Sequence, residues 1–209
     1  MVGSKKNKNA ARYERFFQTC SIEKNTIFYH AYRTCIMSGN PYAIFKYLIE
    51  NEEFKDFKHI WVYGEDEVLD NDNFKRCSND DRVVYVKKDS DEHLRALATS
   101  EYLIENAALP SYWKKKAGQV YINTWHGTPL KCLGKSALDF KRSSITNAQR
   151  NFMLCDYMVM PNKYTTDRML YSYDVKNLMS GEIIEEGYPR IDLIKNTKKE
   201  GVIKLLEEK

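Results

Sequence analysis

A histidine stands between a tryptophan and a glycine in the stretch NTWHGTPLK, residues 123–131. Gly127 leaves space beside the imidazole of His126 and lets the N–H groups of residues 127 and 128 face a ligand. Trp125 can form an apolar wall, and Pro129 stiffens the loop. A neutral imidazole can accept a proton from a hydroxyl near pH 7. We therefore expect His126 to be catalytic or to face a ligand; a structural role is the alternative.

Three nearby or downstream side chains are weaker candidates for binding a phosphate. Thr128 can donate a hydrogen bond to a phosphate or cap a following helix. Lys131 can meet a polyanion or simply be solvated. Arg190 follows Gly187 and Pro189 in EGYPRID and can reach a phosphate, or pair with Asp192. We expect the other histidines, His30, His59 and His93, to be structural or surface residues.

The stretch PSYWKKK mixes aromatic and basic residues in a pattern suited to an interfacial anchor on anionic lipid. We expect the membrane-contacting residues to be Tyr112, Trp113, Lys114, Lys115 and Lys116. The alternative is a solvent-exposed hairpin with one buried aromatic.

The distribution of charge singles out the same part of the chain. Residues 110–150 hold eight basic residues and one acid, so this window carries +7 and the remainder −3 of a net +4. A solvated lysine-rich face and an anion-binding face are both consistent with this charge. Five scattered cysteines without a CxxC pair argue against a disulfide framework or a zinc knuckle. No apolar run approaches the roughly 18 residues of a spanning helix.

The remaining sequence predicts strands that alternate with helices. The chain has 209 residues and 43% apolar content, enough for one substantial core. Helices are expected at residues 39–51, with Asn40 as N-cap, at 89–99, with Asp89 opening a capping box, and at 146–154, 162–173 and 198–209. Short apolar runs predict strands at residues 26–32, 59–63, 82–86, 101–106, 119–125, 156–160 and near 182.

Such alternation predicts an α/β fold with a Rossmann-like parallel sheet and helices on both faces. Ligands of these sheets bind outside the carboxyl ends of the strands. Residues 123–131 follow a predicted strand, so they fall at such an end. We expect residues 1–22 to be a basic polar tail or linker and residues 23–196 to form the domain.

Several motifs in a fixed order resemble those of the CDP-glycerol glycerophosphotransferase family, the teichoic acid primases and polymerases and related capsule enzymes. They are NPYAIFKYLI, the stretch SEYLIENAALPSYWKKKAGQVYINTWHGTPLK, CDYMVMPNKYTTD and GYPRID. The resemblance runs from about Asn25 to Leu193. One segment departs from the family pattern, because Thr34 occupies a position where a glycine is expected.

The resemblance implies one half of a GT-B-type two-domain architecture, namely the amino-terminal acceptor half. His126 would be the general base on the acceptor hydroxyl, with Gly127, Thr128, Lys131 and Arg190 near the acceptor or its phosphate. The substrate would be CDP-glycerol or CDP-ribitol, bound mainly by a second domain, and residues 197–209 would begin the interdomain helix or linker.

The resemblance further implies a lipid-linked polyol-phosphate acceptor and a peripheral position on the cytoplasmic face of an anionic membrane. No metal, other cofactor or nucleic acid is expected. The alternative is a non-catalytic module that docks the acceptor or the membrane. Nucleic-acid binding through the basic window is a weaker alternative, because no recognised motif accompanies it.

Overall fold

The structure is a computed structural model that describes residues 4–197. Within these residues a seven-stranded sheet has the order β3-β2-β1-β4-β5-β6-β7, and every neighbouring pair is parallel. The Rossmann-like parallel sheet predicted from the sequence is confirmed. Its strands are β1 Glu23–His30, β2 Lys58–Tyr63, β3 Val83–Lys87, β4 Ser100–Glu105, β5 Val120–Asn123, β6 Tyr157–Val159 and β7 Glu182–Ile184.

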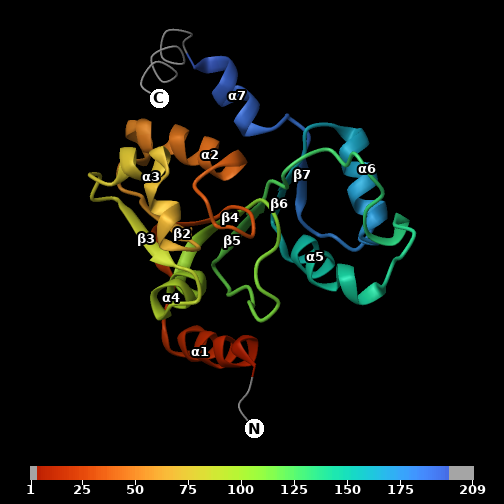
Figure 1. Cartoon of the computed structure of the whole chain (residues 1–209), viewed down its shortest axis with the longest axis horizontal. Helices are drawn as coiled ribbons and strands as arrows, with labels where there is room; N and C mark the ends of the chain where they lie inside the picture. The colour runs from red at the N-terminus through yellow and green to blue at the C-terminus, as the bar shows by residue number, and fades with distance from the viewer. Residues whose placement is uncertain (1–3, 198–209) are drawn as a thin grey trace.

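Helices cover both faces of this sheet. In Figure 1, α2 and α3 lie above the β1–β4 part of the sheet, whereas α4 and α1 lie below it. The helices are α1 Lys5–Thr19, α2 Gly39–Glu50, α3 Asp72–Cys77, α4 Asp91–Thr99, α5 Arg142–Leu154, α6 Lys163–Ser172 and α7 Pro189–Asn196, with 3₁₀ turns at Glu52–Phe54, Asp66–Asp70 and Gly134–Ser136.

Successive strand residues alternate between two apolar clusters, one on each face. On β1, Phe28 joins the cluster that contains residues of α1, α4 and α5, while Ile27 and Tyr29 join the cluster that contains residues of α2 and α3. On β4, Leu103 and Ile104 divide in the same way. Strands buried on both faces read as continuous apolar runs, which is why they were recognisable in the sequence.

The amino-terminal segment differs from the predicted tail. Residues Lys5–Thr19 form α1, with the Ser4 side chain accepting a hydrogen bond from Asn7 N. This helix packs on α4, and its Tyr13 is fully buried and donates a hydrogen bond to Lys114 O at 2.7 Å. The prediction of a polar tail over residues 1–22 is therefore wrong for α1: one aromatic edge of this mostly polar helix is part of the core.

Helix boundaries differ from the sequence prediction in three places. The N-cap of α2 is Ser38, and the buried Asn40 lies inside the helix. Helix α4 is capped by Ser90, whose Oγ accepts a hydrogen bond from His93 N, one residue after the predicted Asp89. Helix α7, which starts at Pro189, was not anticipated beyond a tight turn. The helix predicted at 198–209 lies outside the described residues.

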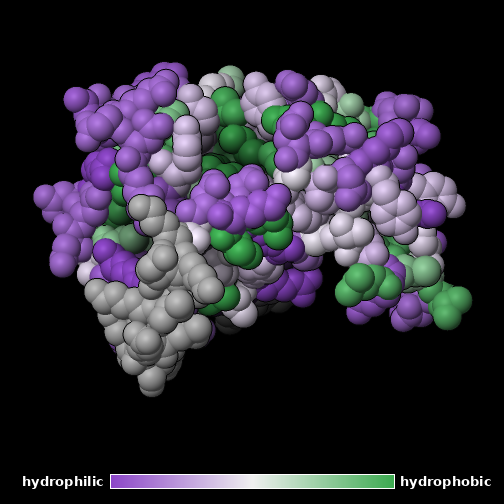
Figure 2. Space-filling view, turned by 90° about the horizontal axis from the view of Figure 1, so that it is seen from above, coloured by the Kyte–Doolittle hydropathy of each residue, from purple (hydrophilic) through white to green (hydrophobic). Residues whose placement is uncertain are grey.

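Seen from above, the molecule shows hydrophilic side chains over much of this face, with one group of hydrophobic residues near the centre and a second at the lower right (Figure 2). Within residues 4–197, no helix combines the length and the apolar character that crossing a bilayer requires.

Candidate active site

The loop that carries His126 begins with a sharp turn at the carboxyl end of β5. Trp125 N donates to Asn123 Oδ1 at 2.9 Å, and Trp125 takes a left-handed conformation with φ of +47°. Such a conformation costs a non-glycine residue on the order of 1–3 kcal/mol. The strand therefore ends at Asn123, two residues before the predicted end, and the turn directs the next side chain across the edge of the sheet.

A main-chain oxygen sets the tautomer of His126. Its Nδ1 lies 2.6 Å from the carbonyl oxygen of Asn106, at the end of the neighbouring strand β4. A carbonyl oxygen only accepts, so Nδ1 carries the hydrogen and Nε2 of the neutral ring keeps a free lone pair. The Trp125 ring stacks on the imidazole with centroids 4.2 Å apart. In its neutral form His126 thus has the tautomer that a general base acting through Nε2 requires.

His126 lines a cavity of about 400 Å³ at the carboxyl edge of the sheet. Trp125 and Tyr173 contribute aromatic walls, and Arg33 and His30 contribute basic groups. The Arg33 side chain is exposed and, among the described residues, has no ion-pair partner. The cavity thus combines the imidazole of His126 with the guanidinium group of Arg33, a group suited to a phosphate.

A buried ion pair lies beneath this cavity. His30 Nδ1 contacts the Glu105 carboxylate, and His30 Nε2 lies 3.1 Å from Cys35 Sγ. Burial by itself would lower the pKa of His30, but the Glu105 carboxylate and the contact with Cys35 raise it to about 10. The other Glu105 oxygen accepts from Ala107 N at 2.7 Å. This carboxylate therefore holds the same short loop whose Asn106 oxygen orients His126.

Arg190 reaches the site from α7, as its position in the sequence suggested, but its partner is a backbone carbonyl. One guanidinium nitrogen of Arg190 donates to His126 O at 2.9 Å, not to Asp192. The amide of Asn40 in α2 donates to Thr124 O at 3.3 Å and Trp125 O at 3.1 Å. Two helices from elsewhere in the chain thereby fix the backbone on both sides of His126.

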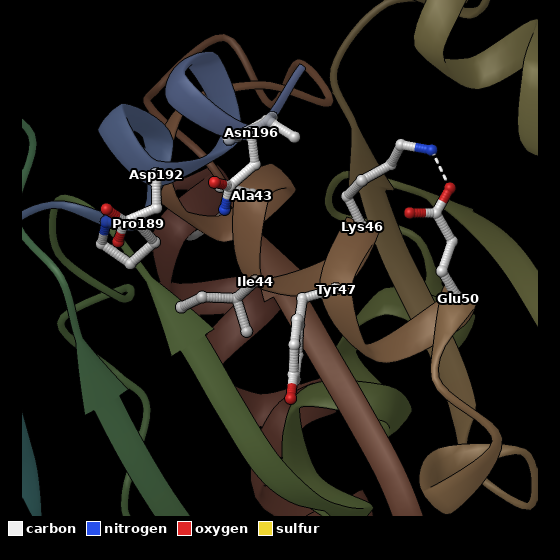
Figure 3. Close-up of a pocket in the computed structure, with 9 residues that line it drawn as sticks. Ala43, Ile44, Lys46, Tyr47, Glu50, Pro189, Asp192 and Asn196 are labelled. Carbon is white, nitrogen blue, oxygen red and sulfur yellow. Dashed lines mark hydrogen bonds and ion pairs between the residues drawn. The ribbon is translucent and has the colours of Figure 1, made fainter. Parts of the chain in front are cut away.

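Helix α7 is placed by its packing on α2. A mainly apolar hollow of about 330 Å³ lies between the two helices, lined by Ile44, Tyr47 and Pro189 among others. Figure 3 shows Lys46 and Glu50 pointing toward each other at its rim, joined as an i,i+4 ion pair. Since Pro189 starts α7 and lines this hollow, the α2–α7 contact sets where the adjacent Arg190 lies.

The other predicted phosphate-binding residues, Gly127, Thr128 and Lys131, differ in their contacts. A Cβ added to Gly127 would meet no atom within 4 Å apart from its chain neighbours, so the space beside this glycine is open. Thr128 Oγ1 lies 2.9 Å from Thr165 Oγ1 on α6 and so joins the loop to a helix; it does not cap one. Lys131 is exposed and has no ion-pair partner among the described residues. The structure leaves Lys131 free for an anion.

The predicted membrane anchor is wrong for its aromatic centre. Trp113 is fully buried, and its ring packs edge-on against Tyr121 with centroids 5.1 Å apart. Tyr112 packs against Tyr13 of α1 at 5.7 Å. The stretch is covered by α1, whose aromatic edge was not apparent in the sequence, so these rings cannot enter a lipid surface.

The three lysines of this stretch are engaged with the protein. Lys114 pairs with Glu14 at 2.6 Å, Lys115 pairs with Asp156, and Lys116 donates to Cys20 O at 2.6 Å. These contacts tie the stretch to α1 and to the start of β6. The stretch is therefore docked on the rest of the protein, with Trp113 buried while Ser111, Lys114, Ala117 and Gly118 remain exposed.

The sequence profile of the family CDP-Glycerol:Poly(glycerophosphate) glycerophosphotransferase matches residues 12–209. The chain belongs to this family. The teichoic acid poly(glycerol phosphate) polymerase of Bacillus spizizenii is 34% identical over 188 residues, covering 87% of this chain and 45% of that protein. The teichoic acid glycerol-phosphate transferase of Staphylococcus aureus is 29% identical over 175 residues, covering 81% and 42%. The chain thus spans about half the length of these relatives or less.

Solved structures of the wall teichoic acid polymerase TagF have the same fold as this chain. One superposes with a TM-score of 0.73 at 25% identity and covers 93% of this chain and 46% of that one. A TagF variant soaked with CDPG gives a TM-score of 0.69 at 26% identity, covering 90% and 45%. The likeness thus covers nearly all of this chain and less than half of the polymerase chain.

Two residues that no sequence motif marks, His30 and Glu105, lie beside the site at the ends of other strands. His30 is buried and ion-paired, in agreement with the expected structural role, and it also ends β1 and lines the cavity, with Glu105 ending β4 beside it. Their shared position at carboxyl ends of predicted strands was the available signal. His59 and His93 are buried, as structural histidines can be. Among the described residues, no group of three or more His, Cys, Asp or Glu could hold a metal ion.

Proposed function

We propose that this chain is the acceptor-side half of a polyol-phosphate transferase that uses CDP-glycerol or CDP-ribitol, with His126 as general base. The observation that carries the proposal is the hydrogen bond from His126 Nδ1 to Asn106 O at 2.6 Å, which in the neutral ring puts the lone pair on Nε2 of a residue that lines the cavity. Membership of the glycerophosphotransferase family and the names of the relatives support the reaction class.

In the proposed reaction, Nε2 of His126 removes the proton of the acceptor's terminal hydroxyl. The hydroxyl oxygen attacks the β-phosphorus of the CDP-alcohol, a new phosphodiester bond forms, and the bond to CMP breaks with its electron pair leaving on CMP. The imidazolium that forms keeps its Nδ1–H on the Asn106 carbonyl. Reactions of this kind depend mainly on positioning and on stabilisation of the phosphoryl charge.

The acceptor would lie along the carboxyl edge of the sheet, with Gly127 leaving room for it and Lys131 near its charges. Arg190 would act by holding the His126 backbone, since its guanidinium already donates to that carbonyl. The CDP-alcohol would be held mainly by a second Rossmann-like half across a GT-B-type cleft. The similarity to about half of TagF supports this division.

We further propose that the acceptor is lipid-linked and that the transferase works as a peripheral protein on the cytoplasmic face of the membrane. Leu130 and Leu138 are fully exposed in the loop between β5 and α5. Lys131, Lys141 and Arg142 are exposed close to them in sequence. Exposed leucines flanked by cations suit an anionic lipid surface. We therefore propose this loop, instead of the stretch around the buried Trp113, as the membrane contact.

Replacement of His126 tests the catalytic assignment. In the complete gene product, His126→Ala should reduce transfer from labelled CDP-glycerol or CDP-ribitol to a lipid-linked acceptor by about 100-fold or more, the range of a general base. Binding of the CDP-alcohol should change little. His126→Gln should remain equally slow, since an amide cannot accept the proton. Transfer at the wild-type rate by either variant would mean that His126 is structural and that the proposed mechanism is wrong.

A further inference from the structure

A second hollow lies beside the candidate active site on the same edge of the sheet. Its volume is about 550 Å³, and it lies where β2 ends at Tyr63 and β3 ends at Lys87. Four basic and two acidic residues contribute to its lining: Lys5, Arg33, Lys87, Lys88, Glu65 and Asp89. The hollow is thus polar, and it occupies the edge where ligands of parallel sheets bind.

Two of the four cations of this hollow are already paired with carboxylates. Lys5 pairs with Asp89 at 2.9 Å and Lys87 pairs with Asp66 at 2.9 Å. Glu65 lies near the same two lysines and raises their pKa values further. Arg33 and Lys88, by contrast, have no carboxylate within ion-pair distance among the described residues. Their two charges remain for a ligand.

Arg33 belongs to both hollows. It lines the His126 cavity as well as the second hollow, so the two sites adjoin at this residue. Lys88 Nζ donates to Arg33 O at 2.9 Å, which ties the loop after β1 to the end of β3. Tyr32 and Cys35, on either side of Arg33, have φ of +55° and +53°. The loop after β1 thus turns sharply on both sides of Arg33, the residue that lines both hollows.

We propose that Arg33 and Lys88 form a binding subsite for an internal phosphodiester of the acceptor chain, behind the unit whose hydroxyl faces His126. The inference rests on the proposed function. An acceptor that is itself a polyol phosphate carries one negative charge per repeat. A guanidinium fork suits two phosphate oxygens, and an ammonium adds a point charge. The subsite favours a chain with several phosphates over a single unit.

Binding of synthetic glycerol phosphate oligomers to the 209-residue chain tests the subsite. Calorimetric titration compares a one-unit ligand, a five-unit ligand and inorganic phosphate. We expect the wild type to bind the five-unit ligand more tightly than the other two. Arg33→Gln should weaken binding of the five-unit ligand about 10-fold, the order expected for one charge-assisted hydrogen bond, and Arg33→Gln with Lys88→Gln should weaken it further. Affinity for the one-unit ligand should stay the same.

A matched control removes two positive charges near the amino-terminal end of β2, at the other end of the strands from the hollow. Lys55 and Lys58 are exposed, and Lys58 is the first residue of β2. Lys55→Gln with Lys58→Gln should leave oligomer binding unchanged. Circular dichroism of each variant verifies folding. If Lys88→Gln disturbs the loop by removing its contact with Arg33 O, the test rests on Arg33→Gln alone, which changes only an exposed side chain.

The outcomes separate the subsite from the proposed function. If the wild type binds no oligomer, the acceptor-side assignment of the chain is overturned together with the subsite. If it binds the five-unit ligand and the Arg33 and Lys88 variants bind it equally well, the acceptor assignment stands and the subsite is wrong. If Lys55→Gln with Lys58→Gln weakens oligomer binding as much as the Arg33 and Lys88 changes do, the oligomer is attracted by the net charge of the chain and the subsite is wrong. Inorganic phosphate that binds as tightly as the five-unit ligand would indicate a free-phosphate site.

Discussion

At the scale of single residues, the chemistry of His126 depends on contacts made by atoms outside its own motif. The proton on Nδ1 is set by a carbonyl at the end of β4, and the loop that carries this carbonyl is held by Glu105. Glu105 is paired with His30 from β1. Contacts among the carboxyl ends of β1, β4 and β5 thus connect the buried His30–Glu105 pair to His126.

The His30–Glu105 pair predicts a pH dependence of stability. His30 has a pKa of about 10 in the folded chain, compared with an ordinary value near 6.5. Its contribution is therefore fully present below about pH 6.5 and is lost as the pH rises toward 10. Urea unfolding of the wild type and His30→Gln should show a stability difference that shrinks between pH 6 and 9.5. A difference that stays constant or grows would mean that His30 is not held protonated.

The partner substitution supplies the matching test. Glu105→Gln leaves the buried imidazole without its counter-charge, and breaking a buried pair in this way costs about 3–5 kcal/mol. The loss should be greatest at low pH, where the imidazole would have to be charged. The double variant His30→Gln with Glu105→Gln should recover part of the stability.

At the scale of elements, α1 acts as a cover for the aromatic stretch at 112–113 and for α4. Tyr13 is fully buried in this contact and donates to Lys114 O. Tyr13→Ala should lower the free energy of unfolding by about 3–5 kcal/mol, the range for a large buried aromatic. Tyr47→Ala on α2 is the control, because Tyr47 is 64% exposed. Equal small losses for both, measured by urea unfolding, would mean that α1 does not belong to the core.

The loop between β5 and α5 carries the proposed membrane contact. Leu130→Ser with Leu138→Ser should reduce sedimentation with phosphatidylglycerol vesicles, because two apolar side chains no longer enter the bilayer surface. The effect of Lys131→Gln with Lys141→Gln should be smaller at high salt, where surface charge is screened. Tyr164→Ser on α6, which removes another exposed side chain, is the control. Unchanged sedimentation of the leucine variant would exclude this loop as the contact.

At the scale of the whole molecule, the 209-residue chain should fold by itself yet transfer nothing. Two apolar clusters cover the two faces of a continuous sheet, which supplies a core of its own. We predict no measurable affinity for CDP-glycerol and no release of CMP, because the proposed mechanism places the CDP-alcohol on another domain. Without that domain the positioning contribution, up to about 7–11 kcal/mol in well-oriented systems, is lost. Micromolar binding in a calorimetric titration would place the nucleotide site in this half instead.

The sequence by itself determined the sheet, because strands buried on both faces must be apolar runs and parallel strands need covering helices between them. It also placed His126 and Gly127 at a strand end, and its ordered motifs indicated the family. These features are local in sequence, because each depends on the types of a few adjacent residues. The burial of Tyr13 is not, since its hydroxyl contacts Lys114 O, 101 residues further along the chain.

Only the tertiary structure decided which residues act together at the site. His30, Glu105 and His126 are separated by up to 96 residues and meet because β1, β4 and β5 are neighbours in the sheet. Arg190 and Asn40 meet the same loop because α7 packs on α2. Strand order and helix packing depend on long-range burial, which no short stretch of sequence specifies. That is why the proposed base was visible in the sequence, while the groups that orient it and the Arg33 subsite beside it were not.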